Sequence, residues 1–297
     1  MQAAVSARAA DYARLVAVPA IWGGTFVGGK VVVGSLSPLM GSFARYVVAC
    51  AALLVAAFVL ERGLPRLTRA QFLGTLALGA LGVFAYNLFF MGAFGRLPAS
   101  RAALIIALNP VITITISALA LGDRLRPRRW VGVAIALIGV WIVVSHGEVS
   151  HLASVGLGWG ELFMLCAVTS WALYTVIGRQ VLAGLSPLAA TNYAALWGTL
   201  LLGLVAAPHF GELRAEQFPA RVVVSLLYLG ILGTALAFVW YYISVKKLGT
   251  AVSSIFTNLV PVFGVAISVL LLGEPLLASM LVGGAVAIVG VMMVSRP

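Results

Sequence analysis

One cation, Arg45, stands out among the side chains of this strongly apolar chain that could do chemistry. It lies about seven residues inside an apolar stretch, where a charge is costly enough to suggest a function. We consider two functional roles: binding a carboxylate of a substrate, or pairing with Glu161 near the outer end of another stretch. The alternative is that its long side chain reaches a polar interface.

Aromatic and amide side chains form a second group of candidates. Trp22 and Trp171 each precede a cation by eight residues, or roughly 12 Å along a helix, which is deeper than the aromatic belt of a membrane interface. Tyr174 lies one turn from Trp171, while Tyr86 and Asn87 fall just past the middle of the third apolar stretch. Aromatic walls with a few hydrogen-bonding groups are typical of a small-molecule pocket. The alternative for each residue is plain helix packing.

Two prolines occupy matching depths in two apolar stretches. Pro110 and Pro261 each fall twelfth in a 23-residue stretch, and each frees the carbonyl four residues earlier in its helix. Such carbonyls need a partner or water at the centre of a membrane. The pattern predicts two hinges that line a polar cavity beside Asn109 and Asn258. Packing kinks are the alternative, since prolines are common in membrane helices.

The remaining candidates give weaker signals. Trp240 lies near Lys246 and Lys247, where it is either part of an interfacial aromatic belt or an inner gate. Glu161 is the one carboxylate that falls within an apolar stretch, and it is shallow, so proton coupling has little support. Its alternative role is a charge that the helix dipole favours at a helix N-terminus. We expect no metal and no cofactor, because no clustered ligands occur.

The elements that must position these residues are membrane-spanning helices. Of the 297 residues, 62% are apolar and only 9% are charged, whereas soluble domains have about a quarter charged residues. A soluble enzyme and a nucleic-acid binder are therefore excluded. The sequence predicts an all-α integral membrane protein with ten transmembrane helices, at 15–34, 38–60, 72–94, 99–121, 130–145, 157–182, 187–207, 222–245, 250–272 and 276–295.

The cations indicate how the helices are oriented. With ten spans both termini share one side, and that side carries 13 of the 19 Lys and Arg residues against 5 on the other. The positive side is cytoplasmic as a rule. We therefore expect both termini in the cytoplasm, with residues 1–14 as a cytoplasmic N-terminal segment that precedes the first retained span.

The chain contains an internal repeat of five spans. Residues 15–145, called the first half below, match residues 157–295, the second half, at an offset of 149 that becomes 151 after a two-residue insertion near the seventh span. Gly82 pairs with Gly233, for example, and Leu-Gly-Asp at 121–123 with Leu-Gly-Glu at 272–274. Because five is odd, the second half must be inverted in the membrane. Inverted repeats suit transport by alternating access.

Three stretches also resemble a known family. The strings LGDRLRPRRWVGVAIALIGV (121–140), LLGEPLLASMLVGGAVAIVGVMMV and SWALYTVIGR (170–179) are similar to the EamA family of the drug/metabolite transporter superfamily, over about 15–295. The resemblance implies a ten-helix metabolite exporter in a bacterial inner membrane, and suggests the amino-acid exporters of the YddG type.

These observations predict a secondary transporter that exports small metabolites, with amino acids first and aromatic or large apolar ones plausible. The alternatives are a proton-coupled multidrug or other metabolite exporter of the same superfamily, a channel, and more distantly a polytopic membrane enzyme. An enzyme is disfavoured because the spans lack paired acids, metal ligands and a nucleophile with its base. No nucleotide-binding loop occurs, so ATP is not an expected partner. The expected partners are a small-molecule substrate and the lipid bilayer, and we expect a monomer.

Overall fold

The computed structural model describes residues 2–109, 111–113, 115–116, 127–144, 158–181, 184–248, 256 and 259–295. These residues form helices and their connections, with no strand among them. Pro110 and Asn258 lie outside the described residues. The helices are α1 (Gln2–Val33), α2 (Pro38–Glu61), α3 (Arg69–Leu78), η1 (Gly79–Ala85), α4 (Tyr86–Phe94), α5 (Ala99–Ile106), α7 (Pro127–Val144), α8 (Trp159–Val181), α9 (Pro187–Ala206), η4 (Ala207–Glu212), η5 (Ala215–Gln217), α10 (Ala220–Leu227), η6 (Tyr228–Leu236), α11 (Ala237–Leu248), α13 (Val260–Leu272) and α14 (Ala278–Ser295).

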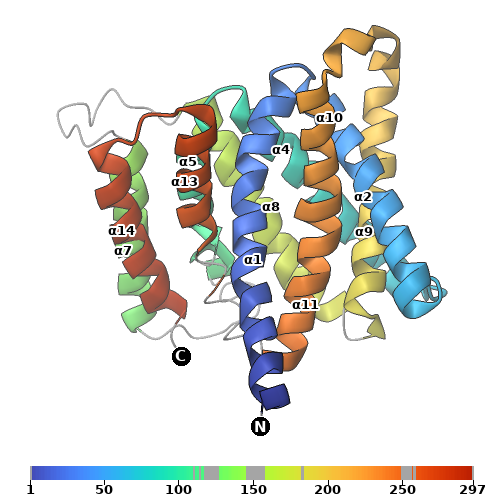
Figure 1. Ribbon diagram of the computed structural model, residues 1–297, viewed down its shortest axis with the longest axis horizontal. Coiled ribbons are helices and arrows are strands. Elements are labelled where there is room, and N and C mark those ends of the chain that lie inside the picture. The colour runs from blue at the N-terminus through green and yellow to red at the C-terminus, as the bar shows by residue number, and fades with distance from the viewer. Residues whose placement is uncertain are drawn as a thin grey trace.

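The described helices form a membrane bundle (Figure 1). Six are long and apolar enough to cross a bilayer: Ala13–Val33, Pro38–Glu61, Arg69–Phe94, Trp159–Gly178, Pro187–Glu212 and Ala220–Tyr241. Four shorter apolar helices coincide with the other predicted spans: Ala99–Thr113, Trp130–Val143, Val260–Leu272 and Ala278–Met293. Apolar side chains on the outside of the bundle, such as Leu270 at 79% exposure, suit contact with lipid rather than water.

Local sequence signals set several helix ends. Ser37 and Ser186 cap α2 and α9, because each hydroxyl oxygen accepts a hydrogen bond from the backbone N–H three residues later. A proline follows each serine at the first helical position, where its missing N–H costs nothing. Gly273 ends α13 with φ 65°, a left-handed conformation that glycine adopts without strain.

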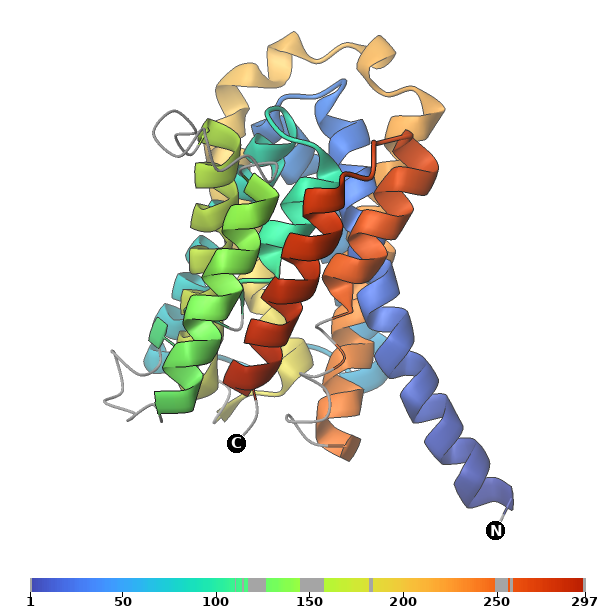
Figure 2. The same cartoon turned by 90° about the vertical axis from the view of Figure 1, so that its left-hand side faces the viewer.

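The first helix is longer than its predicted span. We expected a span at 15–34 after a cytoplasmic segment of residues 1–14, and α1 instead runs as one helix over Gln2–Val33. Figure 2 shows its N-terminal end projecting beyond the rest of the bundle. The small, alanine-rich composition of that segment has high helix propensity, so the helix continues past the apolar span.

Two helices contain wider turns of the π type at matching positions. Segment η1 joins α3 to α4, and segment η6 joins α10 to α11, so each interrupts a long apolar helix near its middle. The sequence did not predict these segments, although Gly82 and Gly233, paired in the repeat, lie one in each. Short π segments occur frequently at functional sites.

Helices α7 and α14 pack side by side at one edge of the bundle (Figure 1). A Cβ added to Gly139 would meet the backbone of Ala287 and Gly283, and a Cβ added to Gly290 would meet the backbone of Ala136 and Gly132. The two backbones therefore touch at both points, which only small residues permit.

Candidate functional site

A small cavity lies at the centre of the bundle, between α2, η1, α8, α9, η6 and α11. Its volume is about 20 Å³, which is room for a single water molecule. The lining residues come from both halves of the chain: Tyr46, Gly82, Val83, Trp171, Tyr174, Thr191, Ala194, Ala195, Thr234 and Phe238. The π segments η1 and η6 contribute Gly82, Val83 and Thr234 to this wall.

Aromatic rings surround the cavity as one connected cluster. The Trp171 ring lies 5.3 Å from the rings of Tyr86 and Tyr174 and 5.7 Å from that of Phe238, measured between centroids. Phe238 also contacts Trp22 at 5.6 Å. The structure thus brings together the four aromatic residues that we singled out in the sequence, and adds Phe238 as the ring that joins the two tryptophans. Their contact with a substrate stays a prediction.

Trp22 has a polar role that its spacing did not reveal. Its Nε1–H donates to the carbonyl oxygen of Gly233 in η6, at 3.1 Å. This bond joins α1 in the first half to the π segment of the second half. Gly233 has no side chain to block the approach, and a Cβ at that position would press on Thr25.

Arg45 is buried and hydrogen-bonded inside the protein. Its side chain is only 5% exposed, so it does not reach a polar interface. Its Nη1 donates to Asn87 Oδ1 at 3.0 Å, and its Nη2 donates to Thr234 Oγ1 at 3.3 Å. The guanidinium also lies over the Tyr46 ring, 5.5 Å from the centroid.

Asn87 and Thr234 are themselves held in place by backbone carbonyls. The Asn87 amide donates to Val83 O at 2.8 Å, and the Thr234 hydroxyl donates to Leu229 O at 2.9 Å. The amide and hydroxyl oxygens therefore remain available to accept from Arg45. Sequence reasoning identified Asn87 but missed Thr234, because one threonine in an apolar span is a common packing residue.

Glu161 does not pair with Arg45, so that part of our prediction was wrong. Its carboxylate lies 3.1 Å from Arg101 Nη2 at the start of α5, and both side chains are largely buried. Glu161 sits in the first turn of α8, where the helix dipole also favours an anion. The ion pair lies toward the end of the bundle opposite the chain termini rather than at the central cavity.

Asn109 and Pro261, the described residues of the predicted hinges, lie near helix ends. Helix α5 ends at Ile106, and Asn109 beyond it accepts a hydrogen bond from Thr113 at 3.3 Å. Helix α13 begins at Val260, so Pro261 is in its first turn and not in the interior of a helix as we expected. A hinge role for Pro261 stays a prediction. Trp240 is half-buried in α11, and its role as a gate is likewise untested.

Buried polar contacts join the helices at the end of the bundle opposite the chain termini. The Glu274 carboxylate, which follows α13, accepts hydrogen bonds from the N–H groups of Ala99 and Ser100 at 2.8 and 2.9 Å. Lys30 Nζ donates to Phe94 O at 2.7 Å and to Leu97 O at 3.0 Å. The turn between α4 and α5 is therefore tied to both halves of the chain. The repeat pattern pointed to Glu274, but not to this contact.

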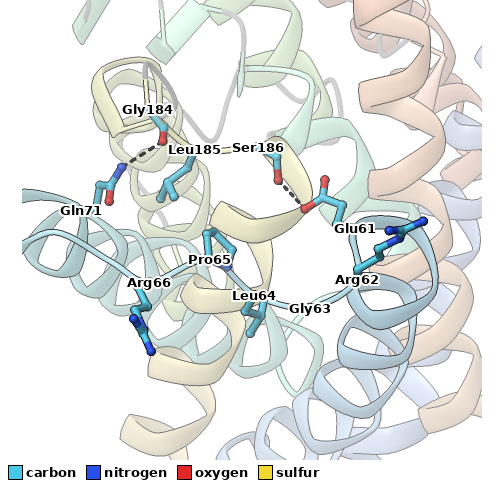
Figure 3. A pocket seen from close by; sticks show the side chains of 10 residues that line it. All are labelled: Glu61, Arg62, Gly63, Leu64, Pro65, Arg66, Gln71, Gly184, Leu185 and Ser186. Atoms are coloured by element: carbon cyan, nitrogen blue, oxygen red, sulfur yellow. Dashed lines mark hydrogen bonds between the residues drawn. The ribbon is translucent and has the colours of Figure 1, made fainter.

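The opposite end of the bundle carries an open hollow of about 430 Å³. Figure 3 shows it between the α2–α3 and α8–α9 connections, where Ser186 donates to Glu61 at 2.7 Å and Gln71 donates to Gly184 O at 2.9 Å. Its other lining residues are Arg62, Gly63, Leu64, Pro65, Arg66 and Leu185. The charge pattern predicts that this end faces the cytoplasm.

Comparison with known proteins identifies the family. The model of the EamA-like transporter family matches residues 12–145 and again residues 158–296. The chain belongs to the EamA-like transporter family. A relative in Bacillus subtilis, the uncharacterized transporter YyaM, is 28% identical over 285 residues, covering 96% of this chain and 93% of that protein. The inner membrane transporter YedA of Escherichia coli, also uncharacterized, is 28% identical and covers 89% and 84%.

Another EamA relative has a more specific name. A probable terminal-alkyne amino-acid exporter of Streptantibioticus cattleyicolor is 33% identical over 258 residues, covering 86% of this chain and 83% of that protein. A solved crystal structure at 19% identity superposes with a TM-score of 0.67 over 96% of this chain and 95% of its own, which shows the fold alone. The chain is thus a multi-pass membrane protein of a transporter family.

Proposed function

We propose that this EamA protein is a secondary exporter of small metabolites, amino acids first, that works by alternating access around the central cavity. The observation that carries the proposal is the cavity wall itself, because matching π segments of the two halves both contribute residues to it. A site shared between two repeats is where transporters of this kind bind their substrates.

Mirrored contacts support an inverted repeat of ten helices, with five in each half. A Cβ on Gly79 would meet Trp197 Cβ and Ala194 O, while a Cβ on Gly230 would meet Val48 Cβ and Arg45 O. These are the same contacts once each residue is replaced by its partner at offset 149 or 151. Cys50 Sγ lies 3.1 Å from Thr199 Oγ1, so one pair of equivalent residues meets directly between the halves.

One tied end of the bundle and the small central cavity support alternating access. The outer end is tied by Glu274 and Lys30, while the central cavity has room for little more than a water molecule. This arrangement is that of a contracted site closed toward the outside. For the cavity to open, the halves would have to move apart around it. Because matching π segments occur in both halves, the cavity could open toward either side of the membrane.

Two observations support amino acids as substrates and the bacterial inner membrane as the location. One relative is named a probable amino-acid exporter and another an inner membrane transporter. The excess of cations on one side supports cytoplasmic termini.

No carboxylate lines the described cavity, which favours a facilitator over the proton-coupled export of cationic drugs.

Efflux from proteoliposomes loaded with a labelled amino-acid panel tests the proposal. We expect efflux of aromatic or large apolar amino acids without any ion gradient, and no dependence on ATP. Liposomes without protein, and liposomes with a heat-denatured sample, provide the baseline. Efflux that starts only when a proton gradient is imposed would overturn the facilitator mechanism, and silence across the panel under both conditions would overturn amino-acid export.

A further inference from the structure

We propose that Arg45 binds the carboxylate of the transported molecule, and that the substrates are small organic carboxylates with an aromatic or apolar body. This inference rests on the proposed transport function and names the substrate class of the same site. Amino acids belong to that class, and so do monocarboxylates that lack an amino group.

The hydrogen bonding of Arg45 is incomplete. A guanidinium carries five N–H donors, but the two acceptors that Arg45 finds, Asn87 Oδ1 and Thr234 Oγ1, are both neutral. Its Nε is buried and has no hydrogen-bond partner. A side chain that is only 5% exposed leaves little surface for water to compensate.

None of the carboxylates whose side chains the structure describes balances this charge. Glu61 contacts Ser186, Glu161 pairs with Arg101, and Glu274 caps α5. The other two, Glu212 and Glu216, are exposed. A buried cation without a counterion is costly, so a ligand that brings a negative charge to this point gains a large electrostatic advantage.

The position of Arg45 places its donors one residue behind the cavity wall. Thr234 lines the cavity, and its bond to Arg45 at 3.3 Å is the longer of the two guanidinium bonds. That bond crosses from α2 in the first half to η6 in the second half. When the halves separate, the bond breaks and Nη2 is free to donate into the enlarged cavity. A carboxylate is then the stronger acceptor, because hydrogen bonds between two charged groups exceed neutral ones.

The side chains around the cavity indicate which chemical body the ligand carries beside its carboxylate. Trp171, Tyr174 and Phe238 present ring surfaces to the cavity, which suit an aromatic or large apolar body. Tyr46 supports the guanidinium from one face and also lines the cavity. Because no described carboxylate lines the wall, an amine without a carboxylate finds the field of Arg45 repulsive.

A matched series of ligands tests this site in the full-length protein. The series is 3-phenylpropionate, phenylalanine, phenylalanine amide and phenethylamine, which share one body and differ in their charged groups. Binding is measured by thermal stabilisation in detergent, and transport by counterflow in proteoliposomes. We expect the two carboxylates to bind on the order of 10- to 100-fold more tightly than the other two, as a charged hydrogen bond predicts.

Variants at three positions identify the residue responsible. Arg45→Gln should remove the preference for carboxylates, and binding of the amide should tighten because its ammonium group is no longer repelled by the guanidinium. Thr234→Val, which introduces the residue found at the matching Val83, removes the competing acceptor and should tighten carboxylate binding several-fold. The control is Arg96→Gln, because Arg96 lies at the outer end over the Phe163 ring and should leave the preference unchanged.

The outcomes separate this inference from the proposed function. If only compounds without a carboxylate are transported or bound, the proposed transport function is kept and the proposed role of Arg45 is overturned. Full carboxylate affinity in a folded Arg45→Gln protein would do the same. Arg45-dependent binding without flux would uphold the site and overturn transport. If Arg45→Gln does not fold, Thr234→Val decides, since an unchanged or weaker carboxylate affinity in that variant contradicts the proposal.

Discussion

The two halves of this EamA protein agree in their backbones and differ in the side chains around the cavity. The π segments and the glycines Gly79 and Gly230 match across the repeat. The polar groups do not match, because Arg45 corresponds to Ala194, and Asn87 to Phe238. Backbone features that govern how helices pack are shared, whereas the guanidinium of Arg45 comes from the first half and the rings of Trp171, Tyr174 and Phe238 come from the second half. In the proposed function, the shared backbone features would serve movement and the differing side chains would serve ligand binding.

The largest effects are expected where the shared packing is broken. Gly79→Val and Gly230→Val should each destabilise the protein by about 3 kcal/mol, because the new side chain meets backbone and Cβ atoms that cannot yield. Thermal melting of the purified protein measures the loss. Gly211→Val is the control, since nothing lies within 4 Å of a Cβ there. A large loss at one glycine and none at the other would break the equivalence of the halves.

A smaller effect is expected at the end of the bundle opposite the termini, where Glu274 of the second half caps α5 of the first. Glu274→Ala should cost about 1 to 2 kcal/mol, because two backbone N–H groups lose a charged acceptor. The same melting experiment applies. Glu212→Ala serves as the comparison, since that glutamate is exposed and contacts only His209 in the described residues. Equal melting temperatures for the two variants would contradict a closed outer end.

The equivalent tryptophans provide a test of asymmetry. Trp22 donates to Gly233 O, whereas the contacts that the described structure gives Trp171 are with rings. Trp22→Phe should therefore cost about 1 kcal/mol more than Trp171→Phe, as expected for the loss of one hydrogen bond. Urea unfolding followed by far-ultraviolet circular dichroism compares the two variants. The reverse order would show that the carbonyl bond contributes little.

The smallest effect concerns Cys50 and Thr199, two equivalent residues that contact each other directly between the halves. Cys50→Ala and Thr199→Ala remove one weak contact between thiol and hydroxyl at 3.1 Å. A double-mutant cycle should give a coupling of about 0.5 kcal/mol. Each single variant also loses its own packing, which the cycle removes from the comparison. A coupling of zero would mean that the two groups are neighbours without an energetic contact.

The sequence predicted well whatever depends on composition and periodicity. Apolar length placed the helices, serine followed by proline marked two helix starts, and Gly273 marked a helix end. Matching glycines pointed to the repeat because close helix contacts constrain residue size on both sides. The cost of a buried charge pointed to Arg45 as a functional candidate, and its burial inside the protein agrees with that reasoning.

The sequence could not predict features that depend on contacts between distant segments. One of the two partners of Arg45 is Thr234, 189 residues away, and no local pattern connects the two residues. Glu161 was assigned the wrong partner because both residues fall in the same predicted half of the membrane and no local pattern shows which helices are neighbours, while its neighbour in space is Arg101. The π segments escaped notice because one wider turn changes the helical period too little to detect in a short apolar run.

The close contact of α7 with α14 restricts how this molecule can move. At Gly139 and Gly290 the two helices touch backbone to backbone, so they cannot approach further, and parting them would open a void along the whole seam. These are the last helices of the two halves. If the two halves rock as the proposed function requires, they would turn about this edge, and the widest displacement would fall on α2 and α9, which lie on the far side of the bundle (Figure 1).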